Sequence, residues 1–177
     1  MFDTIKNIFR KRYLKRYAST VETGLVSLSK IKSSVVFVDA EDKEVEGCKA
    51  SVLSYFKSKG IKASICFLDL SKKTKEEQQI TSLSNTILRK DLNWCGKPSK
   101  DRCNQLAQPD ADLFVSLIDN SDFTIEFMAA ISPAKFKVGR HQVRGNIFDL
   151  VVENGPDQSS SQAEAFAEIT RYIETIG

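Results

Sequence analysis

Metal-binding and redox residues are scarce in this sequence. Its 177 residues include one histidine and four cysteines, and no two cysteines form a CxxC pair. A single imidazole excludes histidine-rich metal sites, and without CxxC pairs the common zinc and thiol-redox motifs are missing too. The eight glycines never form the GxGxxG fingerprint of dinucleotide-binding proteins. The sequence therefore predicts no metal and no cofactor.

Long apolar runs are absent as well. No stretch approaches the roughly 20 apolar residues that span a bilayer. The N-terminus lacks the apolar core and the cleavage site of a signal peptide. Four cysteines without a pairing pattern are typical of a protein in a reducing compartment. With 41% hydrophobic and 28% charged residues, the composition is that of a globular domain. We therefore expect a cytoplasmic protein.

Positive charge is concentrated at the N-terminus. Residues 1–17 carry six Lys or Arg and one Asp, whereas the rest of the chain is slightly acidic. This near-neutral body argues against nucleic acid as a partner. Four apolar side chains of the basic segment recur at helical spacing: Phe2, Ile5, Phe9 and Tyr13. We expect a basic amphipathic helix over residues 1–17, which either packs on the domain or lies on an anionic membrane, and we favour packing.

Short apolar runs alternate with helical patterns in residues 18–177, which we expect to form a single α/β domain. Strands are predicted at residues 34–39, 61–70, 86–90, 112–118, 136–139 and 148–152. Helices are predicted from Val45 to a stop at Gly60, around Phe127, and after a capping box at Ser161 and Glu164. Continuous apolar strands are typical of a parallel sheet covered on both faces. The pattern predicts an α/β fold of three layers, Rossmann-like or flavodoxin-like, with a mostly parallel sheet.

The only tryptophan, Trp94, lies in a polar segment. A large indole among Asp, Asn, Lys, Gly and Pro indicates a loop ordered around an aromatic anchor, so we expect this side chain to be mostly buried. The sequence from Gly96 to Ser99 is similar to the end of a phosphate-binding loop. However, Pro98 separates Lys97 from Ser99, the expected preceding glycine is missing, and no clear helix follows. A phosphate-binding loop is therefore not expected here.

Two further kinds of site would use Cys95. With Cys103 and His141 it offers three ligands to zinc, and with His141 alone it offers a nucleophilic pair. Both sites need residues distant in the sequence to meet without any flanking signature. Neither is the favoured interpretation.

Polar side chains follow the predicted strands at their carboxyl ends. The candidate ligand-binding set among them is Asp39, Asp119, Arg140 and His141. The carboxyl ends of parallel strands share one edge of a sheet, and ligands bind in the crevice outside that edge. Acids beside an arginine and a histidine fit a polar, phosphorylated small molecule. The plainer alternative is that Asp and Asn at strand ends cap the helices that follow.

Several short motifs resemble an uncharacterised family of short α/β proteins from Bacteroidetes. They are residues 90–94, 96–98, 112–115, 132–139 and 148–150, together with the basic N-terminal segment. The resemblance implies a cytosolic single domain and no assigned activity. Cys95 stands where an aromatic residue is expected, which argues against a reactive thiol there. A fainter similarity links residues 134–140 to the Rossmann-like half of sugar-nucleotide glycosyltransferases, at the level of fold alone.

These observations favour a non-catalytic binding or adaptor module that binds an unknown protein partner or a small polar molecule. Its candidate interaction surface consists of Asn93, Trp94, Lys97, Lys135 and Lys137. One alternative is a small enzyme, or a binder of a nucleotide sugar or another phosphorylated small molecule, at the carboxyl edge of the sheet. Another is a peripheral membrane protein held by residues 2–17.

Overall fold

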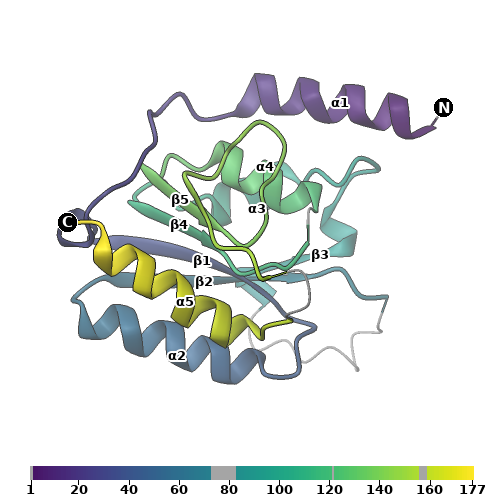
Figure 1. Ribbon diagram of the computed structural model, residues 1–177. Coiled ribbons are helices and arrows are strands. Elements are labelled where there is room, and N and C mark those ends of the chain that lie inside the picture. The colour runs from purple at the N-terminus through teal and green to yellow at the C-terminus, as the bar shows by residue number, and fades with distance from the viewer. Residues whose placement is uncertain (1, 73–82, 121, 156–158) are drawn as a thin grey trace.

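A six-stranded parallel sheet forms the centre of the molecule (Figure 1). The computed structural model describes residues 2–72, 83–120, 122–155 and 159–177. The strands are β1 (Ser33–Asp39), β2 (Lys62–Asp69), β3 (Thr86–Leu88), β4 (Leu113–Ser116), β5 (Phe136–Gly139) and β6 (Leu150–Val151). Their order is β3-β2-β1-β4-β5-β6, and every neighbouring pair is parallel. This is the order of a doubly wound Rossmann-type sheet, so the predicted α/β fold is confirmed.

Helices cover both faces of the sheet. One face carries α2 (Val45–Ser58) and α5 (Gln162–Thr175), and the other carries α3 (Lys100–Leu106) and α4 (Phe123–Ile131) (Figure 1). Val36 and Val38 of β1 pack in the core below α2 and α5, whereas Val35 and Phe37 pack in the core below α3 and α4. Because both faces of the sheet are buried, the consecutive residues 35–38 of this strand are all apolar. Short 3-10 turns complete the chain at Leu28–Lys30, Leu83–Asn85 and Arg89–Asp91.

Local signals explain where the helices begin and end. Ser161 Oγ accepts a hydrogen bond from the Glu164 N–H, and Glu164 Oε2 accepts one from the Ser161 N–H, which is the predicted capping box of α5. Gly60 follows α2 with a φ of +70°, a conformation that glycine adopts at no steric cost.

The helix α3 was missed, because the sequence predicted none after Ser99. In the structure Ser99 Oγ accepts a hydrogen bond from the Arg102 N–H and so caps this helix. Leu106 is its only buried residue, and seven residues with one buried position give no helical periodicity to read.

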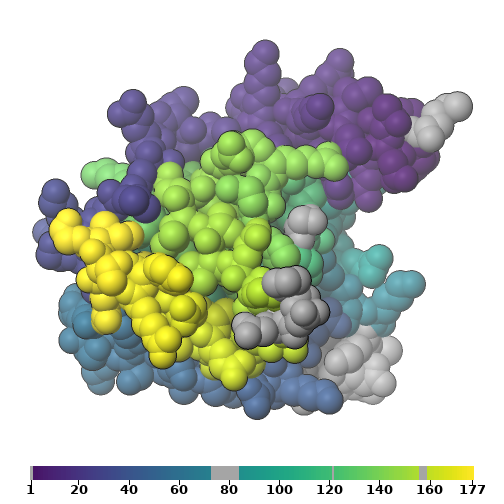
Figure 2. Space-filling view, in the orientation of Figure 1, coloured from purple at the N-terminus to yellow at the C-terminus, as the bar shows by residue number. Residues whose placement is uncertain are grey.

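The N-terminal helix α1 (Phe2–Tyr17) lies outside α4 and forms one rim of the molecule (Figures 1 and 2). Its side chains toward the domain include Phe9 and Tyr13, whereas Ile5 is exposed, so the predicted apolar face is only partly the packed one. No side chain of α1 is fully buried. Within the described residues, none of the helices has the length and apolar character needed to cross a membrane.

Candidate functional site

The loop that contains Trp94 is ordered by an asparagine. Asn93 Oδ1 accepts hydrogen bonds from the N–H groups of Cys95, at 3.0 Å, and Lys97, at 2.9 Å, and the Asn93 N–H donates to the Lys97 carbonyl oxygen at 2.9 Å. Gly96 completes the turn with a φ of +88°, which favours glycine. Hydrogen bonds from Thr124 Oγ1 to the Gly96 carbonyl oxygen, at 3.0 Å, and from Arg10 Nε to the Cys95 carbonyl oxygen, at 2.8 Å, join the loop to α4 and α1. Polar contacts, and not the indole of Trp94, therefore order this loop.

Trp94 is not mostly buried, and that prediction was wrong. Its side chain is 49% exposed. The indole packs in a T-shaped arrangement against the rings of Phe9 and Phe2, with 5.3 Å and 6.1 Å between ring centroids. Because polar contacts order the loop, the indole is not needed beneath it and packs on aromatic rings of α1.

Lys97 fastens α1 to the domain. Its Nζ lies 5.4 to 5.6 Å from the ring centroids of Tyr13, Tyr17 and Phe127, which come from α1 and α4. The same ammonium donates a hydrogen bond to the Pro98 carbonyl oxygen at 3.1 Å. The loop that the sequence marks as an interaction surface is thus in contact with a helix of its own chain.

The two remaining lysines of that candidate surface lie elsewhere. Lys137 is buried, and its Nζ donates to the Ala129 carbonyl oxygen of α4 at 2.7 Å. Burial lowers the pKa of this ammonium, and Asp149 opposes the shift. Lys137 faces the α4 layer because its neighbours in β5 fill the opposite core. Lys135 is exposed just before β5, at the amino end of the strand, so the five residues do not form one surface.

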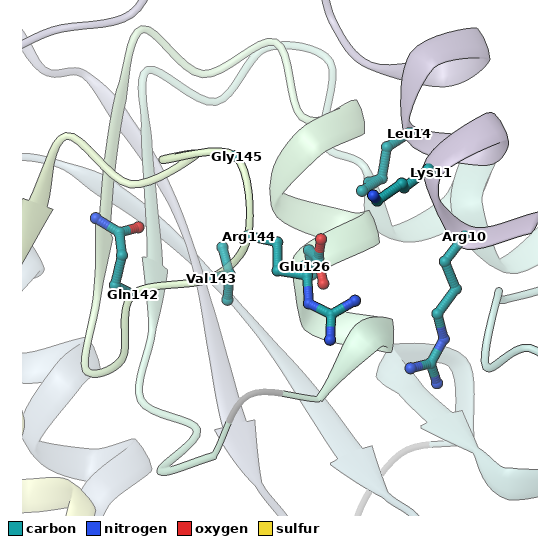
Figure 3. A pocket seen from close by; sticks show the side chains of 8 residues that line it. All are labelled: Arg10, Lys11, Leu14, Glu126, Gln142, Val143, Arg144 and Gly145. Carbon is teal, nitrogen blue, oxygen red and sulfur yellow. The ribbon is translucent and has the colours of Figure 1, made fainter. Parts of the chain in front are cut away.

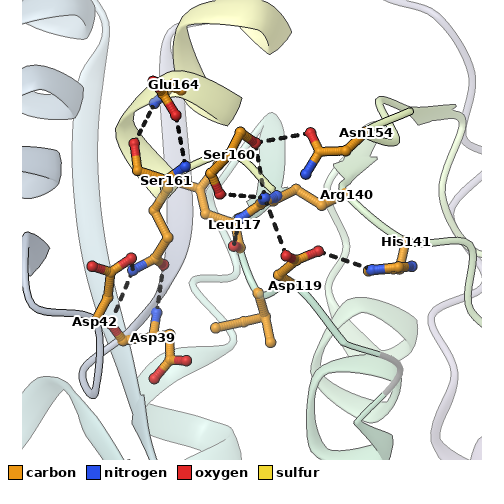
Figure 4. Close-up of polar contacts among 12 residues, drawn as sticks. Asp39, Asp42, Leu117, Asp119, Arg140, His141, Asn154, Ser160, Ser161 and Glu164 are labelled. Atoms are coloured by element: carbon orange, nitrogen blue, oxygen red, sulfur yellow. Dashed lines mark hydrogen bonds and ion pairs between the residues drawn. The ribbon is translucent and has the colours of Figure 1, made fainter. Parts of the chain in front are cut away.

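Three of the four candidate ligand-binding residues meet at the carboxyl edge of the sheet (Figure 4). Asp119 accepts from Arg140 at 3.4 Å and lies 2.9 Å from His141 Nε2. Arg140 also donates to the Leu117 carbonyl oxygen at 3.2 Å and to the carbonyl and hydroxyl oxygens of Ser160, each at 3.0 Å. The buried guanidinium thereby joins the ends of β4 and β5 to the segment before α5.

Asp39 belongs to a different set of contacts. Its N–H donates to Gln162 Oε1 at 2.7 Å, and Gln162 Nε2 donates to the Asp39 carbonyl oxygen at 3.1 Å and to Asp42 Oδ2 at 3.0 Å (Figure 4). Burial raises the pKa of the Asp39 carboxyl, and the charges of Asp42 and Asp69 add to the effect. Gln162 was not anticipated, since its one sequence signal is its place at the start of the last helix.

The cysteine alternatives find no support in this arrangement. Cys95 is buried, and burial raises the pKa of its thiol, which disfavours the reactive thiolate. His141 contacts Asp119. Across the parts of the chain that the structure describes, no three His, Cys, Asp or Glu side chains gather as a metal would require.

A hollow of about 420 Å³, here called the edge pocket, opens at the carboxyl ends of β2 and β3, beside the N-terminus of α4. Its cationic lining residues are Lys6 and Arg10 from α1 and Arg89 after β3, and its other walls include Leu70, Trp94, Asp122 and Thr124. The three cations were not foreseen as site residues because they come from segments far apart in the sequence. Their meeting depends on α1 packing over the Trp94 loop.

Comparison with known proteins gives a family but no activity. The family described as "Family of unknown function (DUF6913)" matches residues 5–176, and no curated protein matches the chain. Among solved structures, an exopolyphosphatase-related protein from Bacteroides fragilis is similar at 14% identity with a TM-score of 0.49, over 81% of this chain and 41% of that one. The expected membership of an uncharacterised family is confirmed: the chain belongs to the family of unknown function DUF6913.

Proposed function

We propose that the protein is a binding module for a small molecule that carries phosphate or a similar anionic group, held in the edge pocket. One observation carries the proposal: Lys6, Arg10 and Arg89 line a hollow at the edge where doubly wound sheets bind ligands. Among the described residues of the lining Asp122 is the one acid, and its Oδ1 accepts from the Thr124 N–H at 2.7 Å. Its negative charge is thus directed at the N-terminus of α4, and the described lining residues keep an excess of positive charge.

The guanidinium of Arg10 is held in position before any ligand arrives. Its Nε donates to the Cys95 carbonyl oxygen at 2.8 Å, and its plane lies over the Phe123 ring at 4.7 Å from the centroid. Arg89 is held in a similar way, since its Nη1 donates to the Leu70 carbonyl oxygen at 3.2 Å. Fixed guanidinium groups lose little freedom when they bind an anion, which favours affinity. The indole of Trp94 adds an apolar wall.

Isothermal titration calorimetry with pyrophosphate and with ADP tests this function. We expect binding that Arg89→Gln weakens by about tenfold, the value of one charge-assisted hydrogen bond. The matched control is Arg171→Gln on α5, because Arg171 is exposed and remote from the pocket. Absence of binding to both probes, or equal weakening by the control, would contradict the proposal.

A membrane surface is the second candidate, and one observation favours it. Ile5 and Ile8 are exposed on α1, on the side that also presents Lys11, Arg12 and Lys15 to solvent. Apolar residues among cations favour binding to anionic lipid. Sedimentation with phosphatidylcholine vesicles, with and without phosphatidylserine, tests this reading. Binding to the anionic vesicles alone, lost on Ile5→Asn with Ile8→Asn, would support it over the edge pocket as the main function.

An adaptor role through Asn93, Trp94 and Lys97 stays a prediction, with the half-exposed indole as its remaining support. The cytoplasmic location and the origin in Bacteroidetes also stay predictions.

A further inference from the structure

A second hollow lies between α1, α4 and residues 142–145 (Figure 3). It has a volume of about 560 Å³ and is here called the lateral pocket. Lys11 and Leu14 of α1, Glu126 of α4, and Val143 and Arg144 of the loop after β5 line it. Volumes of this order are usual for small-molecule sites. None of these five residues lines the edge pocket.

Glu126 is the unusual residue of the lateral pocket. The residue is only 7% exposed, and no side chain among the described residues forms an ion pair with its carboxylate, whose oxygens keep some accessible surface. Figure 3 shows this carboxylate facing the space between Arg144 and Lys11. Burial raises the pKa of Glu126, and the charges of Arg144 and Arg10 oppose the rise. A nearly buried acid without a partner carries a free-energy cost that a donor in the pocket would relieve.

The charged side chains around Glu126 indicate which charges a ligand of this pocket would carry. Arg10 also lines this pocket, but its side chain is directed away from Glu126, and its guanidinium lies over the Phe123 ring beside the edge pocket (Figure 3). Lys11 and Arg144 therefore remain as two cations beside one carboxylate. Arg144 is oriented by its hydrogen bond to Asn7 Oδ1 at 3.1 Å. The complementary ligand has one positive and two negative charges.

We infer that the lateral pocket binds an acidic zwitterion, a small molecule with one ammonium group and two negative charges. The ammonium group donates to the Glu126 carboxylate, and the acidic group binds Arg144 and Lys11. Dicarboxylic amino acids and phosphorylated amines share this chemistry. The inference is independent of the function proposed for the edge pocket, because it rests on Glu126 and Arg144, which that pocket does not include.

Titration calorimetry on the full chain tests the inference with three probes: L-glutamate, O-phosphoethanolamine and glutarate. Glutarate has the two carboxylates of glutamate but no ammonium group. We expect at least one zwitterion to bind about tenfold more tightly than glutarate, the usual gain from a charge-assisted hydrogen bond. Glu126→Gln should abolish that preference, since the amide keeps the shape and loses the charge. Arg144→Gln should weaken binding of every probe by a similar factor. The two zwitterions distinguish a second carboxylate from a phosphate as the acidic group.

Glu22→Gln is the matched control, because Glu22 is exposed and lies outside both pockets. The inference would be overturned if neither zwitterion bound more tightly than glutarate, or if the preference for a zwitterion survived Glu126→Gln. Should Glu126→Gln fail to fold, Arg144→Gln decides, since Arg144 is exposed in a loop. A pyrophosphate titration of the same variants distinguishes the two proposals. Both substitutions leave Lys6, Arg10 and Arg89 in place, so binding in the edge pocket should persist.

Discussion

Arg10 Nε donates a hydrogen bond to the Cys95 carbonyl oxygen at 2.8 Å across 85 positions of the chain. This contact ties α1 to the Trp94 loop, and the Cys95 residue that supplies the acceptor is buried. A buried carbonyl that loses its donor pays the full cost of its desolvation.

Replacing Arg10 therefore should destabilise the protein. We expect Arg10→Met to lower the free energy of unfolding by about 1 to 3 kcal/mol, because methionine keeps much of the apolar stem but not the donor. Urea denaturation gives the value. Arg12→Met is the control, since Arg12 is exposed and has only a 5.9 Å approach to the Phe9 ring. Equal effects of the two substitutions would show that the Arg10 contact does not hold α1.

Lys97 should control how often α1 opens. Lys97→Met removes an ammonium that faces three aromatic rings, a loss of about 1 to 2 kcal/mol in cation–π energy. We expect faster hydrogen exchange of the amides in residues 2–17, with the amides of β1 unchanged. Lys100→Met, at an exposed position of α3, serves as control. Unchanged hydrogen exchange in α1 would show that Lys97 does not stabilise the docked position of this helix.

Arg140 and Asp119 share one ion pair but should respond differently to substitution. The Arg140 side chain is 2% exposed and that of Asp119 is 48% exposed. Arg140→Met leaves the carbonyl oxygens of Leu117 and Ser160 without their donor, and we expect a loss of about 3 kcal/mol. Asp119→Asn should cost less than about 1 kcal/mol, as surface ion pairs do. Chemical denaturation measures the free energy of unfolding of both variants. Similar losses would contradict this expectation, because they would assign the stabilisation to the ion pair with Asp119 and not to the two carbonyl oxygens.

Glu126 should make the stability of the protein depend on pH. Its folded-state pKa is raised above the ordinary value of 4.5, so the folded protein holds the proton more tightly than the unfolded chain. The stabilisation is complete below the unfolded value and is lost as pH rises through the folded value. Glu126→Gln should therefore be more stable than wild type at about pH 8, and the difference should shrink toward about pH 4. Urea denaturation at both pH values tests this, and a constant difference would contradict it.

The fold was predictable because its signals are local. Each strand is a short apolar run, and the capping box at Ser161 or the glycine at position 60 can be read from a few neighbouring residues. The helix α3 was not predicted, because it has one buried residue, Leu106, and a single apolar position gives no helical periodicity.

The candidate site was predictable only in part, because it depends on contacts between distant segments. The strand-end rule predicted the contacts among Asp119, Arg140 and His141, but it did not predict that the backbone of Asp39 bonds to a glutamine at the start of α5. Nothing near Arg89 in the sequence shows that α1 supplies the other cations of the edge pocket. The burial expected for Trp94 was also wrong, because its indole packs on aromatic rings of α1, which lies far away in the sequence.

The edge pocket and the lateral pocket share a wall, since Arg10 of α1 lines both. No side chain of α1 is fully buried, so its detachment is a local unfolding event that costs less free energy than unfolding of the sheet. Each such opening dismantles both hollows while the rest of the fold persists. A ligand that bound in either pocket would therefore favour the docked position of α1. By linkage, two such ligands would raise each other's affinity by the same factor.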